Sequence, residues 1–304
     1  MKMASLAHNV KRPYSELASA YDQTIGWPAF HRARRAFEAL ARRYGLRFRS
    51  AADIGCGTGL FARYLSDCWG APVLAVDISP EMLRVAEGNC SGANVRLLRQ
   101  DIRCLRLPGP VDLVTSNFDA LNHLTGEGEL RVAFQCISRN LRPGGHLYFD
   151  LVTPCQPLGG GTTYARRMNT RGRQVTQRIR WDRTRRMISI FVAIRSMDSP
   201  RPTLEVHRER AYLFAEVGRW LMDAGFVIRG VHDAATLLPA TGCPARIIVV
   251  AQKAGARATN RIRRMRSGSK AGLPRVGEDG APGAERAPGE NNCQRSKMLR
   301  ACEK

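Results

Sequence analysis

Apolar and polar positions alternate in two ways along the first 253 residues, and each way predicts a different element. In residues 30–44, apolar side chains recur at helical spacing and predict a helix with one buried face. Short continuous apolar segments predict buried strands at 50–55, 72–77, 95–101, 111–118 and 146–152. Helix-like segments follow several of them, at 59–69, 79–89 and 128–141, and Ser79 is the expected N-cap of the second. This alternation predicts a parallel sheet with helices on both faces.

The pattern changes near residue 160, where strand-like segments follow one another without helices between them. The segments 172–181, 187–197 and 202–213 predict an antiparallel insertion within about 160–213. A helix at 214–225 and two strands, 226–233 and 245–253, complete the folded part. The predicted fold class is therefore α/β, a doubly wound and mostly parallel sheet with an antiparallel β insertion.

Composition separates the end of the chain from the rest. Residues 254–304 are rich in Gly, Pro and charge, have few large apolar side chains, and predict a disordered basic tail after a domain at 1–253. The 304 residues carry a net charge of +22, but only six of the 48 Lys plus Arg residues are lysines. The charge can attract polyanions such as nucleic acid. A solvated basic surface and an unselected tail are the alternatives.

Apolar runs and cysteines indicate the cellular compartment in which the protein is expected. No apolar run approaches the roughly 20 residues of a membrane helix, and residues 1–17 lack the apolar core of a secretory signal. The nine cysteines form no CxxC pair, which predicts reduced thiols without a disulfide framework or a metal site. We therefore expect a cytoplasmic protein without membrane insertion.

Candidate chemistry begins at a glycine-rich turn between the predicted strand 50–55 and helix 59–69. It contains Asp53, Gly55, Cys56, Gly57, Thr58 and Gly59. Glycines at such a turn let the backbone approach a ligand closely. Residue 60 is Leu where a dinucleotide fingerprint has its third glycine, so a nicotinamide or flavin dinucleotide is disfavoured. The alternative is an ordinary glycine-rich turn.

Two carboxylates follow at the ends of the next predicted strands. Asp77 ends the strand 72–77, where it can accept hydrogen bonds from the two hydroxyls of a ribose. Asp101 ends the strand 95–101, where it can accept the exocyclic amine of adenine. Each alone is also compatible with a helix cap or a loop. Together with the glycine turn, they favour a nucleoside ligand.

The segments ADIGCGTG, LAVDISPEML, RQDIRCL, VDLVTSNFDALNHL and LRPGGHLYFDL form an ordered series. This series resembles the motifs of class I S-adenosylmethionine-dependent methyltransferases, in particular their small-molecule branch. The resemblance covers about residues 14–253. It implies a seven-stranded Rossmann-like sheet whose last strand, 245–253, is antiparallel.

The resemblance also implies roles for residues at matching positions. The glycine turn contacts the methionine part of S-adenosylmethionine, and Asp77 holds its ribose. Ile78, Met82, Asp101 and Ile102 surround the adenine, and Asn117 and Phe118 line the methionine end. Tyr21, in the segment SELASAYDQ, is a candidate lid residue, with helix packing as the alternative.

The acceptor side is less well defined. His123, just after the predicted strand 111–118, is the candidate general base, with a structural or capping histidine as the alternative. His207, Arg210 and Tyr212 of the insertion are candidate substrate-binding residues, and Arg210 can hold an acidic group by a bidentate pair. Their alternative is a solvated sheet face.

These features predict an S-adenosylmethionine-dependent methyltransferase that acts on N or O of a small molecule. The stretch Ser116-Asn117-Phe118-Asp119 contains no proline, unlike the tetrad of amino-directed DNA methyltransferases. An RNA methyltransferase and a non-catalytic S-adenosylmethionine-binding module remain as alternatives. The acceptor and the oligomeric state are left open by the sequence.

Overall fold

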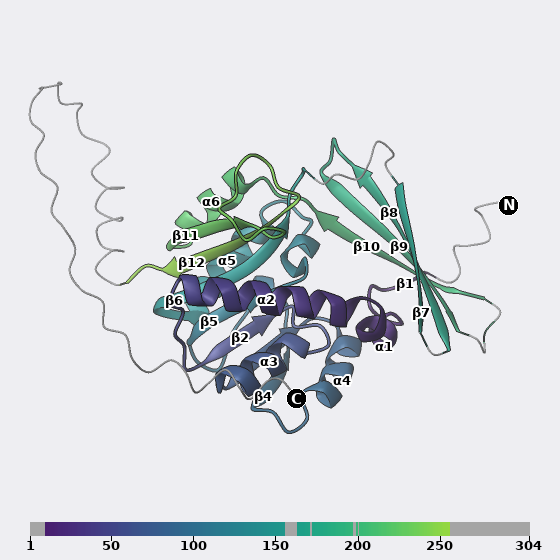
Figure 1. Ribbon diagram of the computed structural model, residues 1–304, viewed down its shortest axis with the longest axis horizontal. Coiled ribbons are helices and arrows are strands. Elements are labelled where there is room, and N and C mark those ends of the chain that lie inside the picture. Colours follow the sequence, from purple (N-terminus) through teal and green to yellow (C-terminus); the bar gives the residue numbers. More distant parts are fainter. Residues whose placement is uncertain (1–9, 156–162, 171, 197–198, 200, 256–304) are drawn as a thin grey trace, which may run out of the picture. The chain divides into compact units, whose positions relative to one another are not determined.

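The computed structural model describes residues 10–155, 163–170, 172–196, 199 and 201–255 (Figure 1). Residues 10–255 belong to one compact unit built on two sheets. The predicted tail lies outside the described residues, except for Ala254 and Gly255. None of the described helices is long and apolar enough to cross a bilayer.

The larger sheet has seven strands in the order β11-β12-β6-β5-β2-β3-β4. Its members are β2 (Ala51–Ile54), β3 (Val73–Asp77), β4 (Val95–Arg99), β5 (Val111–Ser116), β6 (Leu141–Val152), β11 (Phe226–Asp233) and β12 (Arg246–Lys253). Strands β2 to β6 pair in parallel, and β12 is antiparallel to both of its neighbours. The predicted doubly wound sheet with an antiparallel last strand is confirmed.

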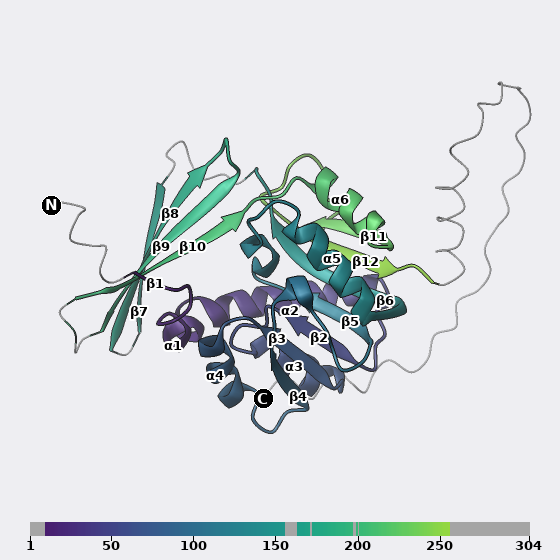
Figure 2. The same cartoon turned by 180° about the vertical axis from the view of Figure 1, so that it is seen from behind.

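Two apolar layers hold helices against opposite faces of this sheet. On one face pack α2 (Trp27–Arg43) and α3 (Leu60–Trp69), with Phe37 and Phe61 fully buried. On the other face pack α5 (Glu129–Asn140) and α6 (Phe214–Asp223), as the view from behind shows (Figure 2). Helix α4 (Pro80–Asn89) begins after Ser79, whose hydroxyl accepts a hydrogen bond from the Met82 amide at 3.2 Å. The predicted cap at Ser79 is confirmed.

The second sheet has the order β1-β10-β9-β8-β7 and confirms the predicted antiparallel insertion. It contains β7 (Thr163–Thr170), β8 (Arg173–Asp182), β9 (Met187–Ser196) and β10 (Thr203–Arg210). One further strand, β1 (Val10–Lys11), comes from the N-terminal segment and pairs in parallel with β10. Two residues are too few for a period-two pattern, so the sequence gives no sign of this strand.

Short helical turns complete the frame around the sheets. The N-terminal segment forms α1 (Ala18–Tyr21) and the π-helical η3 (Asp22–Gly26), which continue into α2. The turns η4 (Ile102–Cys104) and η5 (Ala120–His123) follow β4 and β5. Strand β6 starts at Leu141, five residues before the predicted strand 146–152, and therefore includes Pro143 and both following glycines.

The prediction that all cysteines are reduced is wrong for one pair. Cys155 and Cys243 form a disulfide with their Cα atoms 5.6 Å apart. Strands β6 and β12 pair with Val152 opposite Arg246, and the same register extended by three residues places Cys155 opposite Cys243. This proximity follows from strand pairing over a sequence separation of 88, which Cys spacing alone does not reveal. Among the described residues, Cys56, Cys68, Cys90, Cys104 and Cys136 are thiols.

Candidate active site

The glycine turn joins β2 to α3 through three residues with positive φ: 67° at Gly55, 54° at Gly57 and 82° at Gly59. Residues other than glycine rarely adopt a positive φ. A Cβ at Gly55 would also lie 2.4 Å from the Cβ of Ala120. At Gly57 an added Cβ would meet no atom within 4 Å, so the loop borders open space there. The turn therefore presents bare backbone to a ligand.

Asp77 fixes this turn from the end of the neighbouring strand. Its Oδ2 accepts the Gly57 amide at 2.8 Å, and its Oδ1 accepts the Ser79 amide at 2.9 Å. Burial raises the pKa of Asp77, and these backbone hydrogen bonds oppose that rise. Asp77 thus has a positioning role for the loop in addition to any contact with a ribose.

A cavity of about 720 Å³ lies over the carboxyl ends of these strands. This volume is in the range of pockets that hold a drug-sized ligand. The structure brings to its wall most of the predicted cofactor residues: Tyr21, Gly55, Cys56, Gly57, Thr58, Asp77, Ile78, Met82, Asp101, Ile102, Asn117 and Phe118, together with His123. We call it the cofactor cavity.

Two predicted cofactor residues do not line this cavity. Asp53 is buried below the turn, where its carboxylate accepts the Thr115 hydroxyl at 2.7 Å, and burial raises its pKa to about 7. Gly59 packs against helix α4, and an added Cβ would lie 2.7 Å from the Cys90 sulfur. Asp53 and Gly59 therefore pack on the side of the turn that faces away from the cavity.

A second cavity, of about 380 Å³, adjoins the first. Tyr14, Tyr21, Asn117 and Phe118 line both cavities, so the two meet at these side chains. The other polar residues that line the second cavity are Arg32, Asp119, Asp150, Arg166, Gln177, His207, Glu209 and Arg246. We call it the acceptor cavity, since a second reactant placed there adjoins the methionine end predicted for the cofactor.

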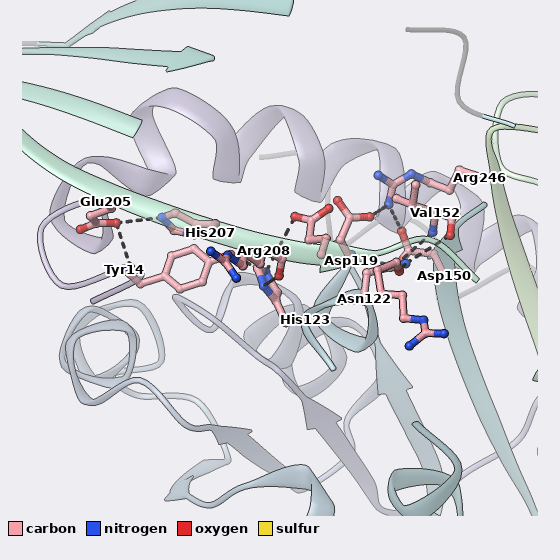
Figure 3. Close-up of polar contacts among 12 residues, drawn as sticks. Tyr14, Asp119, Asn122, His123, Asp150, Val152, Glu205, His207, Arg208 and Arg246 are labelled. Carbon is pink, nitrogen blue, oxygen red and sulfur yellow. Dashed lines mark hydrogen bonds and ion pairs between the residues drawn. The ribbon is translucent and has the colours of Figure 1, made fainter. Parts of the chain in front are cut away.

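One side of the acceptor cavity carries a buried ion cluster. The Arg246 guanidinium lies between the carboxylates of Asp119 and Asp150 and pairs with both (Figure 3). Burial raises the pKa of Asp150, and the Arg246 charge opposes that rise. Glu209 belongs to the same wall but is not part of these pairs.

His123 is held by two hydrogen bonds that define its tautomer (Figure 3). Its Nδ1 lies 3.2 Å from the Arg208 carbonyl oxygen, an atom that can only accept, so Nδ1 carries the proton. Its Nε2 lies 2.9 Å from the Tyr14 hydroxyl and accepts from it while the ring is neutral. Burial lowers the pKa of His123, assisted by the nearby His207. The basic nitrogen of His123 thus faces Tyr14.

The N-terminal segment is tied to strand β10 through one buried carboxylate, Glu205. It accepts the backbone amides of Tyr14 at 2.9 Å, Glu16 at 2.6 Å and Leu17 at 3.1 Å. His207 Nε2 lies 2.9 Å from the same carboxylate. Tyr14 has a φ of 64°, unfavourable for an aromatic residue, so these contacts hold a strained residue between the two cavities.

Known proteins resemble this chain in sequence and in fold. Residues 51–145 match the sequence profile of a family described as Methyltransferase domain. The matched segment contains the glycine turn, Asp77, Asp101 and His123, and the match agrees with the resemblance expected from the motif series.

Two curated relatives extend the comparison beyond the methyltransferase domain. A dTDP-3-amino-3,6-dideoxy-alpha-D-glucopyranose N,N-dimethyltransferase of Streptomyces fradiae is 31% identical over 132 residues, which are 43% of this chain and 51% of that protein. The cypemycin N-terminal methyltransferase of a Streptomyces species is 29% identical over 211 residues, 67% of this chain and 83% of that protein. The chain thus spans about half the length of the first of these relatives.

Solved structures match the fold around the methyltransferase domain. An S-adenosylmethionine-dependent methyltransferase from Clostridium acetobutylicum superposes with a TM-score of 0.67 at 23% identity, over 80% of this chain and 99% of that one. The amino pentose methyltransferase CalS10 from Micromonospora echinaspora superposes with a TM-score of 0.60 at 24% identity, over 78% and 95%. Both matches extend well beyond residues 51–145, because they cover about four fifths of the chain.

Of the predicted substrate residues, only His207 lines a cavity beside the methyltransferase domain. Tyr212 is buried, and its hydroxyl donates to the Leu124 carbonyl. The Arg210 guanidinium lies over the Tyr212 ring at 5.7 Å. The expectation that these two face the acceptor is not met. Tyr212 lies beyond the end of β10, where its amide donates to the Val152 carbonyl at 3.1 Å and turns the chain into the core.

The sequence did not reveal several residues that line the two cavities, nor Glu205, which anchors one of them: Tyr14, Asp119, Asp150, Glu209 and Arg246. One signal for part of them was present. Along β10, Glu205, His207 and Glu209 alternate at period two, and all three are buried. A strand that turns its polar side chains inward points to a polar interior site.

Proposed function

We propose that the protein is an S-adenosylmethionine-dependent methyltransferase whose acceptor is a nitrogen atom of a small molecule. The observation that carries the proposal is the junction of the two cavities at Tyr14, Tyr21, Asn117 and Phe118. A methyl group leaving one cavity can enter the other there without crossing solvent.

The cofactor cavity fits S-adenosylmethionine by its donor set. The glycine turn offers backbone at Gly57, and Asp77 and Asp101 offer carboxylates at the ends of neighbouring strands. Asn117 Nδ2 is buried and has no hydrogen-bond partner within the described part of the chain. A bound ligand would satisfy this donor at the predicted methionine end.

When bound, S-adenosylmethionine supplies a methyl group already activated on a sulfonium. The residues here therefore have to orient an acceptor and exclude water. Alignment of the two reacting atoms at about 3–3.5 Å can account for much of the rate. Tyr14, Tyr21 and Phe118 stand at the junction where this alignment has to occur.

The choice of nitrogen is supported by the names of both relatives. One is an N,N-dimethyltransferase of an amino sugar and the other an N-terminal methyltransferase. Their acceptors differ in size and in backbone chemistry but share an amine. Asp119 and Asp150 of the acceptor cavity are paired with Arg246, and the third carboxylate, Glu209, suits a basic nitrogen better than a neutral hydroxyl.

The test is label transfer. Purified protein is incubated with methyl-labelled S-adenosylmethionine and a bacterial lysate, which is then separated into small-molecule, RNA and protein fractions. Label in the small-molecule fraction, on nitrogen by mass spectrometry, is the expected result. Label in RNA alone would replace the proposal with an RNA methyltransferase. Measured cofactor binding with no label in any fraction would contradict an enzymatic role.

A further inference from the structure

The acceptor cavity contains a buried carboxylate, Glu209, that stands apart from the ion pairs of Arg246. Glu209 is 6% exposed and lines this cavity. Within the described part of the chain, no lysine or arginine forms an ion pair with it. Its nearest basic atom is His123 Nε2, 3.9 Å from Oε1.

His123 does not compensate this charge. Its Nε2 accepts the Tyr14 hydroxyl at 2.9 Å while the ring is neutral, and burial keeps the pKa of the ring low. The one guanidinium of the buried cluster, Arg246, already faces Asp119 and Asp150. Three arginines line this cavity, Arg32, Arg166 and Arg246, and none of them forms an ion pair with Glu209 among the described residues.

A buried and unpaired carboxylate is costly, and a cationic ligand removes that cost. A second observation points to a ligand at the same place. Asn117, 5% exposed, lines both cavities, and its Nδ2 has no hydrogen-bond partner among the described residues. A ligand in the acceptor cavity would therefore meet both Glu209 and Asn117.

We propose that Glu209 binds the acceptor as an ammonium ion and takes its proton before methyl transfer, so that the acceptor is a basic amine. This proposal rests on the proposed function and assigns the group that selects the acceptor. Burial and the charge of Asp119 raise the pKa of Glu209, and the charge of Arg246 opposes that rise. The raised pKa makes the Glu209 carboxylate a stronger base than an exposed one.

The step balances in protons and electrons. The ammonium gives one proton to the Glu209 carboxylate and becomes a neutral amine with a free lone pair. This lone pair forms the new N–C bond as the C–S bond breaks, and the electron pair of that bond stays on sulfur. The product is an N-methylammonium, which carries the positive charge that the sulfonium loses. Glu209 then releases its proton to water.

The first test uses the amine itself. The small-molecule fraction of a lysate is divided, and one half is treated with an amine-acylating reagent that leaves hydroxyls unreacted. Each half is incubated with wild-type protein and methyl-labelled S-adenosylmethionine. We expect label in the untreated half and at least a 10-fold loss in the acylated half. Equal label in both halves would overturn this inference and leave the proposed methyltransferase activity standing.

The second test uses the labelled, untreated fraction with variants. In Glu209→Gln we expect at least a 100-fold slower transfer, the order of a lost general base. The Kd for S-adenosylmethionine should stay within twofold, since Glu209 does not line the cofactor cavity. Glu209→Asp keeps the charge and should recover part of the rate. The control Glu87→Gln, on the exposed surface of α4, should transfer at the wild-type rate.

The outcomes separate the two proposals. A folded Glu209→Gln protein that transfers label at the wild-type rate would overturn the role of Glu209. Wild-type protein that binds S-adenosylmethionine and labels nothing would overturn the proposed function, and this inference with it. If Glu209→Gln does not fold, the acylation test and Glu209→Asp still decide.

Discussion

Asp77 links the glycine turn to the start of α4, each through one of its two carboxylate oxygens. Its two carboxylate oxygens accept amides from the glycine turn and from the start of α4, so one side chain sets the spacing between them. The sequence predicted only a ribose contact for this residue. In the structure the same carboxylate also organises the loop on which the ligand would lie.

We expect Asp77→Asn to weaken S-adenosylmethionine binding by about 1.5–3 kcal/mol, the range for loss of a hydrogen bond to a charged group. Asparagine keeps one acceptor oxygen, but its amide nitrogen cannot accept a backbone N–H. Isothermal titration calorimetry measures the change, with the unfolding midpoint as a check on folding. Wild-type affinity in the folded variant would show that the carboxylate serves the loop alone.

Asp53 predicts a pH dependence of stability. Burial raises its pKa to about 7 in the folded state, against about 3.9 in an unfolded chain. Between these values the unfolded chain loses a proton that the folded protein keeps, so Asp53 lowers stability as pH rises through this window. The cost is complete above pH 7 and absent below pH 4.

Asn at position 53 cannot ionise, yet its carbonyl oxygen can still accept the Thr115 hydroxyl. Relative to wild type, Asp53→Asn should therefore gain roughly 2–3 kcal/mol of unfolding free energy between pH 5 and pH 8, at about 1.36 kcal/mol per unit. Urea unfolding at the two pH values gives this difference. If the unfolding free energies of both proteins changed equally between pH 5 and pH 8, Asp53 would already be ionised in the folded protein.

At the scale of elements, strand β10 contributes to both sides of the acceptor region. Glu205 anchors the N-terminal segment that carries Tyr14, and Glu209 lines the acceptor cavity. The glycine turn and α4 also hold this segment, because Asp22 in η3 accepts the Thr58 hydroxyl at 2.5 Å and the Asn89 amide at 2.8 Å. Strand β10 and the glycine turn together hold the segment over the junction of the cavities.

We expect Glu205→Gln to loosen this segment, since one amide oxygen cannot satisfy the three backbone donors that the carboxylate accepts. Hydrogen exchange at residues 14–17 should accelerate, and the loss of stability should be about 1–3 kcal/mol. Methyl transfer should slow through kcat more than through KM. Glu209→Gln is the matched control for exchange, because Glu209 bonds to none of these amides within the described chain. Unchanged exchange at residues 14–17 would contradict the anchoring role.

The sequence predicted the elements and contacts that depend on neighbouring residues. The glycine turn, Ser79 as a cap, Asp77 and Asp101 follow directly from strand ends in a parallel sheet. Glu205, by contrast, contacts Tyr14 across 191 positions, and Arg246 contacts Asp150 across 96. Such pairs depend on which strands become neighbours, and no local pattern records that choice. Arg210 does not line the acceptor cavity because it follows Glu209 and therefore lies on the opposite face of β10, and Tyr212 lies beyond the end of that strand.

At the scale of the whole molecule, the disulfide joins the end of β6 to the residues just before β12. Between Cys155 and Cys243 the chain contains β7 to β10, α6 and β11. One covalent bond therefore closes a long loop that contains most of the second sheet. Closure of a loop this long restricts the unfolded chain strongly.

We expect Cys155→Ser to lower the unfolding free energy by about 2–4 kcal/mol. Reductant should lower the wild-type midpoint to nearly that of the variant and leave the variant unchanged. Thermal unfolding of both proteins with and without dithiothreitol measures this, and Cys68→Ser, an exposed thiol away from the pair, is the control. A wild-type midpoint that does not respond to reductant would indicate that the bond does not form in solution.

The closed loop also determines what a protease could separate. A single cut anywhere between positions 155 and 243 would leave both pieces covalently joined, and gel electrophoresis without reductant would show one band of unchanged mass. The cut molecule would keep the N-terminal anchor Glu205 and the glycine turn on pieces that cannot diffuse apart. The protein could therefore be cut between residues 155 and 243, or receive an inserted sequence there, and still be recovered as one molecule.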